Sequence, residues 1–370
     1  MEQHGFFEAP FFWRGRYRFH LLTKRLLHRF QPGELMFLQH SDLDRLMAAS
    51  IARKLPVAIV NLRPYLSGQY AAPGVYDLME TGIPLFETGD GAGRLLTFVK
   101  NYPVGHAVLW RRRLYITAPD QMIMTVLRPV RPPTLQRELI RLKETWQARF
   151  RDIAYNTAVF MQQEVETMGA PYVWPAVTEQ LKGKTVLILI RSATSEADLQ
   201  ALRQAYDLSD WMFIGVDGGA DSLLTYGLRP HFVVGDFDSV SDRALTLSLE
   251  RLLHVYADGR APERERLLKL NLPFYTISVP GTSEDVAIRM AVESEAETIF
   301  VIGRHHTLLD ALEKGRKGLS STVLLTLMYG HRFDDLTGFA DWQKRFAQKG
   351  HTAPDVPSVS DETWTGTDSV

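Results

Sequence analysis

Residues 184–190, KTVLILI, begin a series of short apolar runs that decides the fold of the carboxyl-terminal half. Further runs follow, separated by helical segments or turns: WMFIGVD (211–217), HFVVGD (231–236), LLHVY (252–256), FYTISV (274–279) and TIFVIG (298–303). Near-continuous apolar strands are typical of a parallel sheet that is covered on both faces. The pattern therefore predicts a doubly wound, mainly parallel α/β domain over residues 183–340.

The amino-terminal half predicts a second, smaller α/β domain over residues 31–131. The runs LMFLQ (35–39) and VAIVN (57–61) have the composition of buried strands. Between them, Ser41 stands where a helix-capping residue is expected. The two halves thus differ in size but share one fold class.

A long helix is predicted between the two domains, over residues 134–169, with a linker completing the segment 132–182. Its apolar stripe consists of Leu135, Leu139, Leu142, Trp146, Phe150, Ile153, Thr157 and Phe160. A stripe that persists for about five helical turns needs a partner surface. The protein's own domains and the same helix of a second copy, in a homodimer, are equally compatible with it.

The two ends of the chain differ in charge. Residues 14–30 interleave basic side chains with aromatics and leucines, and we set residues 1–30 apart as a basic, aromatic arm. An amphipathic segment packed on its own domain is favoured over a phosphate-binding or membrane-surface arm. The tail from residue 351 has four acidic residues and no Lys or Arg, and we expect residues 341–370 to be a polar, disordered tail.

Composition limits the function classes. The 370 residues carry 42 Lys and Arg against 43 Asp and Glu, so the chain has no overall attraction to nucleic acid. The absence of cysteine excludes disulfides, thiolate metal sites and cysteine nucleophiles. No apolar stretch approaches the roughly 18 residues that a membrane span needs. We therefore expect a soluble, cytoplasmic protein.

Polar or glycine residues follow every predicted strand of the carboxyl-terminal sheet. In an open α/β sheet, ligands bind beyond the carboxyl ends of the strands, where helix N-termini supply backbone N–H groups. The candidate binding residues are Asp217, Gly218, Gly219, Gly235, Asp236, Asp238, Ser239, Arg260, Gly281, Thr282, Ser283, Asp285, Gly303 and Arg304.

Two of these residues, Asp236 and Asp238, flank Phe237. In an extended stretch both carboxylates would point to one side and the phenyl ring to the other. Two carboxylates on one face suit Mg²⁺, which binds one or two carboxylates together with substrate phosphates. A structural interpretation stays open, because Asp217 can form an Asx-turn and Thr282 with Asp285 matches a helix capping box.

Two motifs, VDGGA (216–220) and RPHFVVGDFDS (229–239), resemble the start of the thiamin pyrophosphokinase catalytic domain. Longer segments, among them residues 22–45, 67–70, 280–285 and 302–322, look like SteA-type bacterial proteins of the cytokinetic ring. The kinase family transfers a diphosphate from ATP to the thiamin hydroxyl. The resemblance implies that Asp217, Asp236 and Asp238 hold Mg²⁺ and the phosphates, with Ser239 beside them.

The kinase motifs are incomplete in this chain. Where the family has Lys-Asp-x-Thr-Asp, the chain has GTSED (281–285), which keeps only Asp285 and lacks the lysine. The family's Gly-Gly-Arg-x-Asp-His segment is reduced to Gly303 and Arg304. Without this lysine, the phosphates lack one positively charged contact. Arg260 or Arg304 would restore the contact if its side chain pointed inward, because guanidinium groups hold phosphates with two hydrogen bonds.

Three functional hypotheses follow. The first is a SteA-like division protein that binds a nucleotide or diphosphate with Mg²⁺, without being an authentic thiamin kinase. The second is an active ATP-dependent diphosphokinase with thiamin or a related alcohol as acceptor. The third is a non-catalytic assembly scaffold. Because no transmembrane segment is predicted, a role at the septum requires recruitment by a division-ring partner protein.

Overall fold

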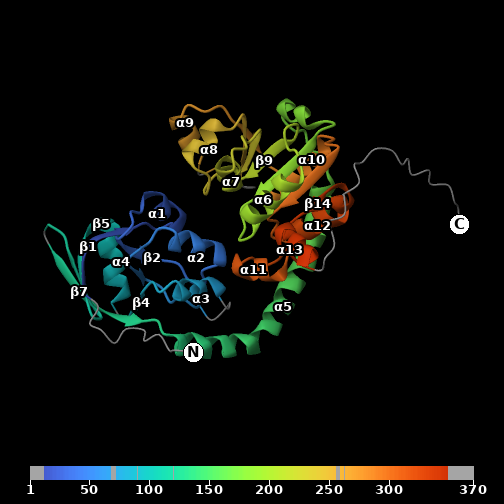
Figure 1. Cartoon of the computed structure of the whole chain (residues 1–370). Coiled ribbons are helices and arrows are strands. Elements are labelled where there is room, and N and C mark those ends of the chain that lie inside the picture. The colour runs from blue at the N-terminus through green and yellow to red at the C-terminus, as the bar shows by residue number, and fades with distance from the viewer. Residues whose placement is uncertain are drawn as a thin grey trace, which may run out of the picture.

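The computed structural model describes residues 12–348, apart from residues 68–71, 90, 120, 256–258 and 262. Figure 1 shows two units, a barrel and an open sheet, joined by the long helix α5 (Pro132–Gly169). The chain is thus a mixed α/β protein with a parallel sheet, as expected. In the described part of the chain, no helix is both long and apolar enough to cross a membrane.

The first unit is a closed barrel with the strand order β1-β2-β3-β4-β7-β6-β5. Strands β1 to β4 run parallel to one another, and the remaining neighbours are antiparallel. The strands are β1 (Phe12–Phe19), β2 (Leu35–Leu38), β3 (Ala58–Asn61), β4 (Leu85–Thr88), β5 (Val104–Trp110), β6 (Arg113–Thr117) and β7 (Met122–Pro129).

The part of residues 1–30 that the structure describes packs on its own domain, which is the interpretation that the sequence favoured, but as part of the barrel and not as a separate arm. Strand β1 pairs with β2 and β5, so it completes the barrel. Its basic side chains alternate with Tyr17 and Phe19, which are buried in the barrel core. The Tyr17 hydroxyl donates to the Tyr102 carbonyl at 2.7 Å. The basic and aromatic composition therefore reflects the two faces of a strand.

Four helices accompany the barrel: α1 (Thr23–Arg29), α2 (Arg45–Ala52), α3 (Pro73–Glu80) and α4 (Ala92–Asn101). Helices α1, α2 and α3 bury side chains in one cluster, which includes Leu26 and Ile51. Asp44, rather than the predicted Ser41, caps α2 by accepting from the Met47 N–H at 2.6 Å. Helices α1 and α2 lie on the side of the barrel that faces the sheet (Figure 1).

The second unit is a parallel seven-stranded sheet with the order β12-β11-β10-β9-β8-β13-β14. The chain starts in the interior at β8, builds one side strand by strand, and then crosses to β13 on the other side of β8. The strands are β8 (Thr185–Ile190), β9 (Met212–Val216), β10 (Phe232–Gly235), β11 (Glu250–His254), β12 (Tyr275–Ile277), β13 (Thr298–Ile302) and β14 (Asp334–Asp335).

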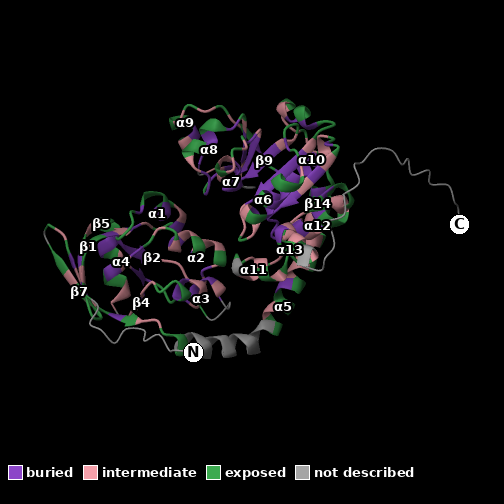
Figure 2. Cartoon of the chain, in the orientation of Figure 1, coloured by how far each residue is buried: buried purple, intermediate pink, exposed green. Residues whose placement is uncertain are grey.

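Helices cover both faces of this sheet. Figure 2 shows buried residues concentrated in the strands and in helix α10, which packs on the sheet centre. Leu199 of α6 lies in the cluster on the opposite face. The remaining elements are α6 (Ser195–Ala205), α7 (Gly219–Thr225), α8 (Asp242–Leu247), α9 (Arg264–Lys269), α10 (Ser283–Glu293), α11 (Leu308–Glu313), α12 (Ser320–Tyr329), α13 (Phe339–Gln348) and the 3₁₀ turns η1 (Ala176–Leu181) and η2 (Gly330–Arg332).

Helix α5 (Pro132–Gly169) connects the units and matches the expected long helix in extent. Its second half packs on its own chain, since the Thr157 hydroxyl accepts from the Leu319 N–H at 3.0 Å and Ser320 donates to Glu164 at 2.8 Å. The side chains of residues 134–146 lie outside the described part. Packing on the protein's own domains thus accounts for the second half of the helix, and the homodimer stays a prediction.

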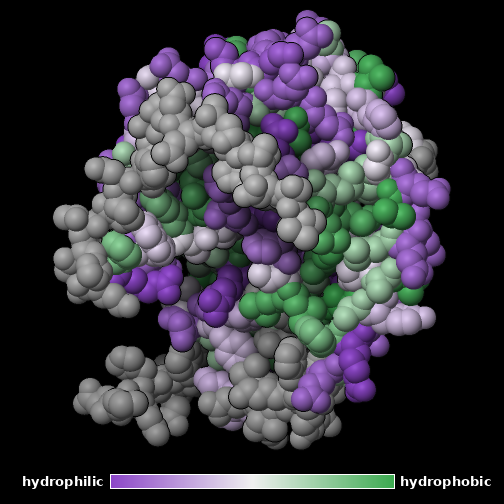
Figure 3. All heavy atoms as spheres, turned by 90° about the vertical axis from the view of Figure 1, so that its right-hand side faces the viewer, coloured by the Kyte–Doolittle hydropathy of each residue, from purple (hydrophilic) through white to green (hydrophobic). Residues whose placement is uncertain are grey.

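Exposed apolar side chains mark the surface near this helix. In Figure 3, where the right-hand side of Figure 1 faces the viewer, hydrophobic residues gather on part of the surface. Among the exposed apolar residues are Val165 of α5, Val173 after it and Leu327 of α12, which is 71% exposed. The dimer prediction concerns the apolar stripe of the 134–169 helix and not these residues.

Two local features concern the end of the described chain. Helix α11 ends at Glu313 and α12 begins at Ser320, with the basic segment 314–317 between them. Residues 341–348, expected to be disordered, belong to α13, which packs on α6. The remaining tail, residues 349–370, lies outside the described residues.

Candidate functional site

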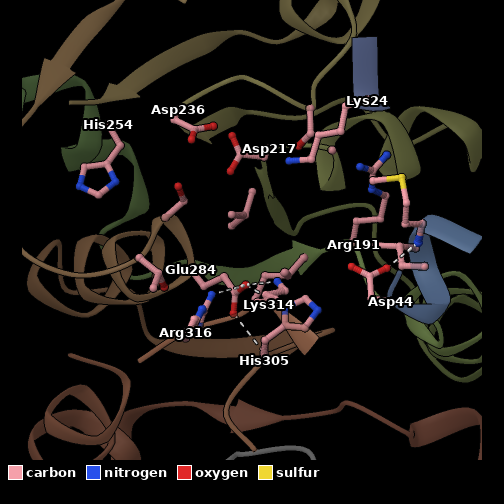
Figure 4. A pocket seen from close by; sticks show the side chains of 18 of the residues that line it. Lys24, Asp44, Arg191, Asp217, Asp236, His254, Glu284, His305, Lys314 and Arg316 are labelled. Atoms are coloured by element: carbon pink, nitrogen blue, oxygen red, sulfur yellow. Dashed lines mark hydrogen bonds and ion pairs between the residues drawn. The ribbon is translucent and has the colours of Figure 1, made fainter. Parts of the chain in front are cut away.

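A cleft of about 1270 Å³ lies between the barrel and the carboxyl ends of the sheet strands. One wall consists of residues from α1, α2 and their flanking turns, including Lys24 and Lys54. The other wall follows β8 to β12 and includes Arg191 and Asp217 (Figure 4). The chain connections that follow the neighbouring strands β8 and β13 leave in opposite directions. In an open α/β sheet, the crevice beyond such a pair of strand ends is the usual place for a ligand.

Asp217 follows β9 and points into the cleft. Its backbone is left-handed, with φ 46°, and its carboxylate accepts from the Phe237 N–H at 2.9 Å. Gly235, at the end of β10, has φ 152°, and a Cβ built there would lie 2.0 Å from the Asp217 carboxylate oxygen. A side chain at position 235 would therefore displace Asp217, so this glycine is required by a close approach.

The carboxylates of Asp217, Asp236 and Asp238 influence one another. Burial, and after it the negative charges of Asp236 and Asp238, raise the pKa of Asp217 to about 7, although the Phe237 hydrogen bond and the Lys24 ammonium oppose this rise. Burial, followed by the charge of Asp238, also raises the pKa of Asp236. The pair Asp217 and Asp236 therefore does not carry two full negative charges throughout the neutral pH range.

A lysine from the barrel reaches these aspartates. The Lys24 ammonium of α1 donates to both Asp238 oxygens, at 2.8 and 3.0 Å, across 214 residues of sequence. Figure 4 shows Lys24 directed toward Asp217. GTSED lacks the lysine of the kinase motif, but Lys24 of the barrel unit brings a positive charge to the aspartates.

The expected magnesium site is not formed as the described residues lie. Phe237 is left-handed, with φ 64°, so the stretch from Asp236 to Asp238 is a turn and not the extended segment that the sequence suggested. Asp238 is paired with Lys24. Among the described residues, no group of three or more His, Asp or Glu side chains is arranged to hold a metal ion. Asp236 and Asp238 thus lack the one-sided arrangement that the sequence suggested, and magnesium binding with a substrate phosphate stays a prediction.

A second charged cluster centres on Glu284 at the start of α10. Its carboxylate accepts from the His305 N–H at 3.0 Å and contacts His305 Nδ1 at 2.8 Å. Lys314 and Arg316, from the break between α11 and α12, lie 3.4 and 3.9 Å from it. Burial alone would raise the pKa of Glu284, but His305 and the two cations outweigh burial and lower that pKa to about 2. Glu284 is therefore ionised at neutral pH.

Arg191, directly after β8, differs from these paired groups. Its guanidinium lies against Gly218, where a Cβ would be 2.7 Å from the guanidinium carbon. Among the described residues, none accepts a hydrogen bond from this side chain. Gly281, Thr282 and Ser283, at the N-terminus of α10, line the same cleft. An unpaired guanidinium and a helix N-terminus both favour an anion.

The structure divides the candidate residues into two groups. Those that line the cleft are Asp217, Gly218, Asp236, Ser239, Gly281, Thr282 and Ser283. Those outside its lining are Gly219, Gly235, Asp238, Arg260, Asp285, Gly303 and Arg304. The first group comes from strand ends β9, β10 and β12, which the topology places along one edge.

Two candidates in the second group serve the fold. Asp285 forms the capping box with Thr282 and also accepts from the hydroxyls of Ser321, at 2.8 Å, and Thr322. Arg304 is buried, donates to Thr326 at 2.6 Å and lies over the Phe333 ring. The structural interpretation therefore accounts for the motif residues Asp285 and Arg304, and Arg304 does not supply the missing charge. Arg260 is exposed, and Asp258 beside it lies outside the described residues.

The sequence reasoning missed several groups that line the cleft. Motif matching selected Asp285 and Arg304, whereas their neighbours Glu284 and His305 face the cleft. The basic segment 14–30 was noticeable, but nothing local showed that it meets the basic segment 314–317 at one site. The missed residues with ionisable side chains are Lys24, His28, His40, Asp44, Arg53, Lys54, Arg191, His254, Glu284, His305, Lys314 and Arg316.

Comparison with known proteins gives limited similarity. No protein-family model and no curated protein matches the chain. Among solved structures, it is similar to thiamin pyrophosphokinase from Geobacillus thermodenitrificans, with 24% identity, a TM-score of 0.25, and 41% of this chain and 58% of that chain covered. Thiamine pyrophosphokinase from Bacillus subtilis gives 24% identity, a TM-score of 0.23, and 40% and 55% coverage. The chain thus spans less than two thirds of either structure.

Proposed function

We propose that the cleft binds a small molecule carrying a phosphate or diphosphate, such as a nucleotide, at the carboxyl ends of the sheet strands. The observation that carries this proposal is the unpaired Arg191 guanidinium, which lines the cleft beside Gly218. A cation held at the edge of a cleft without a carboxylate partner is stabilised by an anionic ligand. Guanidinium geometry suits the paired oxygens of a phosphate.

The surrounding groups support the same ligand class. Lys314 and Arg316 share one carboxylate, Glu284, so the cluster of these three residues has an excess of positive charge. The N-terminus of α10 adds the positive end of its dipole. The cleft is also larger than the roughly 300–1,000 Å³ that a small-molecule site usually occupies, so it has room for a nucleotide.

Calorimetric titration of the full chain with inorganic pyrophosphate and with ADP tests this proposal. We expect saturable binding of both in the absence of Mg²⁺, because the protein supplies its own cations around the cleft. Binding should weaken as salt rises, since ionic strength screens exposed charges. Titration with sodium chloride at matched ionic strength is the control for non-specific heats. If neither compound binds, the proposal is wrong.

Transfer of a diphosphate is the alternative that binding alone does not establish. We expect no release of AMP from ATP in the presence of thiamin and Mg²⁺, because two of the kinase motif residues, Asp285 and Arg304, are committed to structural contacts. AMP can be measured by chromatography. Release that is lost in Asp236→Asn would instead establish the diphosphokinase hypothesis, with the aspartates at the phosphates.

The cell-division role is a proposal of a different kind. It depends on the segments that resemble SteA-type proteins, including residues 22–45, part of which forms helix α1 and contributes Lys24 to the cleft. In that role the protein would act as a ligand-binding or scaffold component recruited to the septum by a partner. A fluorescent fusion that stays evenly distributed in dividing bacterial cells would contradict it.

A further inference from the structure

The barrel wall of the cleft also has a positively charged surface. Lys24 and His28 lie on α1, and Arg53 and Lys54 directly follow α2; all four line the cleft. Asp44 is the only carboxylate among the barrel residues of the described lining. It caps α2 by accepting from the Met47 N–H. The wall that faces the sheet therefore has more cations than carboxylates.

Lys54 is the least compensated of these cations. Among the described residues, no carboxylate or other acceptor bonds its ammonium, whereas Arg53 lies 3.5 Å from Glu196. Arg191, on the opposite wall, is equally unpaired. Two cations from different units therefore border one cleft, and within the described chain neither has a partner.

The pKa of His28 is affected by positive charges from both units. Burial lowers the pKa of His28, and the positive charges of Arg266, Lys54 and Arg191 lower it further, against an opposing effect of Asp221. Asp221 is itself occupied, because it accepts from the N–H and hydroxyl of Ser241. Lys54 of the barrel and Arg191 of the sheet thus both act on one imidazole. An anion placed between these two cations would lower their mutual repulsion.

Ion pairs hold the barrel wall in this place. Arg25 of α1 contacts the buried carboxylate of Glu263 at 2.5 Å, and Lys24 contacts Asp238 at 2.8 Å. Leu312 of α11 packs against the apolar cluster beneath α1 and α2. These contacts join the barrel to the sheet unit around the cleft without any ligand.

We infer that the barrel is half of the binding site: a phosphate or diphosphate group of the ligand lies between Lys54 and Lys24 of the barrel and Arg191 of the sheet. This inference rests on the proposed function and adds to it the unit that provides the second set of cations. The ligand joins the two units, and its affinity depends on residues that the sheet unit lacks. Lys24 then contacts both Asp238 and the ligand.

Barrel variants of the full chain test the inference, with inorganic pyrophosphate as the calorimetric probe. Lys54→Gln removes a charge that has no described partner, so it should leave folding intact and weaken pyrophosphate binding about tenfold, the effect of one charged contact. Lys24→Gln combined with Lys54→Gln should weaken binding by more than either change alone. Arg45→Gln is the matched control, because Arg45 lies on α2 outside the cleft lining.

The outcomes separate the two proposals. Weaker binding by Lys54→Gln, with Arg45→Gln unchanged, supports a site shared by both units. Wild-type affinity in Lys54→Gln and in the double variant overturns the inference while the proposed function stands. No binding by the wild-type chain overturns the proposed function, and the inference with it. Thermal unfolding of each variant checks that lost affinity is not lost structure.

Discussion

Glu284→Gln should destabilise the protein by about 3 kcal/mol at pH 7. The carboxylate is 9% exposed and is the common partner of His305, Lys314 and Arg316. Removing one member of a buried charged cluster leaves the others unpaired, and such changes typically cost about 3–5 kcal/mol. A lowering of the carboxyl pKa from its usual 4.5 to about 2 corresponds to a similar energy, about 3 kcal/mol.

The same pKa predicts how this difference changes with pH. The folded protein holds Glu284 ionised, so its pKa in the folded state is below that in the unfolded chain. The stabilisation is therefore fully present above about pH 4.5 and is lost as pH falls toward 2. Urea unfolding of both proteins at pH 7 and pH 3 should show the gap between them narrowing.

An exposed ion pair provides the control. Glu265→Gln removes the partner of Lys269 at 3.9 Å, where both side chains are at least 80% exposed. Such pairs contribute little, so this variant should stay within about 0.5 kcal/mol of the wild type at either pH. A Glu284→Gln penalty that is equal at pH 7 and pH 3 would contradict the assignment of an ionised carboxylate held by cations.

The sheet unit could be predicted because its signals are local. Runs such as TVLILI and HFVVGD are apolar throughout, since parallel strands are buried on both faces. The barrel was harder to predict, because β5, β6 and β7 have few buried residues and alternate more exposed with less exposed positions. Their closure onto β1 and β4 also joins segments distant in sequence. Strand β1 was taken for an arm because its outward positions are basic.

Some residues of the candidate site could likewise be predicted from the sequence, and others could not. Asp217 and Asp236 could be selected because strand ends of a parallel sheet meet at one edge. The role of Asp285 was ambiguous from sequence, since one pattern fits a ligand contact and a capping box, and tertiary hydrogen bonds from Ser321 and Thr322 decide for the cap. Lys24 lies 214 residues from Asp238, so no local pattern predicts their contact.

Arg191→Gln should have the largest effect on ligand binding. A hydrogen bond to a charged group contributes about 1.5–3 kcal/mol, so losing it should weaken pyrophosphate binding roughly 10- to 100-fold. Arg191→Lys keeps the charge but loses the planar fork, so we expect an intermediate affinity. The fold should be little affected, because no described residue accepts a hydrogen bond from this guanidinium.

Calorimetry of the three proteins at one ionic strength, followed by urea unfolding, makes this test specific. Lys182→Gln is a matched control, since Lys182 pairs with Glu295 on the surface and lies outside the cleft lining. An affinity that falls in the order wild type, Arg191→Lys, Arg191→Gln, at unchanged stability, would identify Arg191 as a phosphate contact. Equal affinities in all three would mean that the anion lies elsewhere, because an unpaired guanidinium beside a bound phosphate has to contribute to its binding.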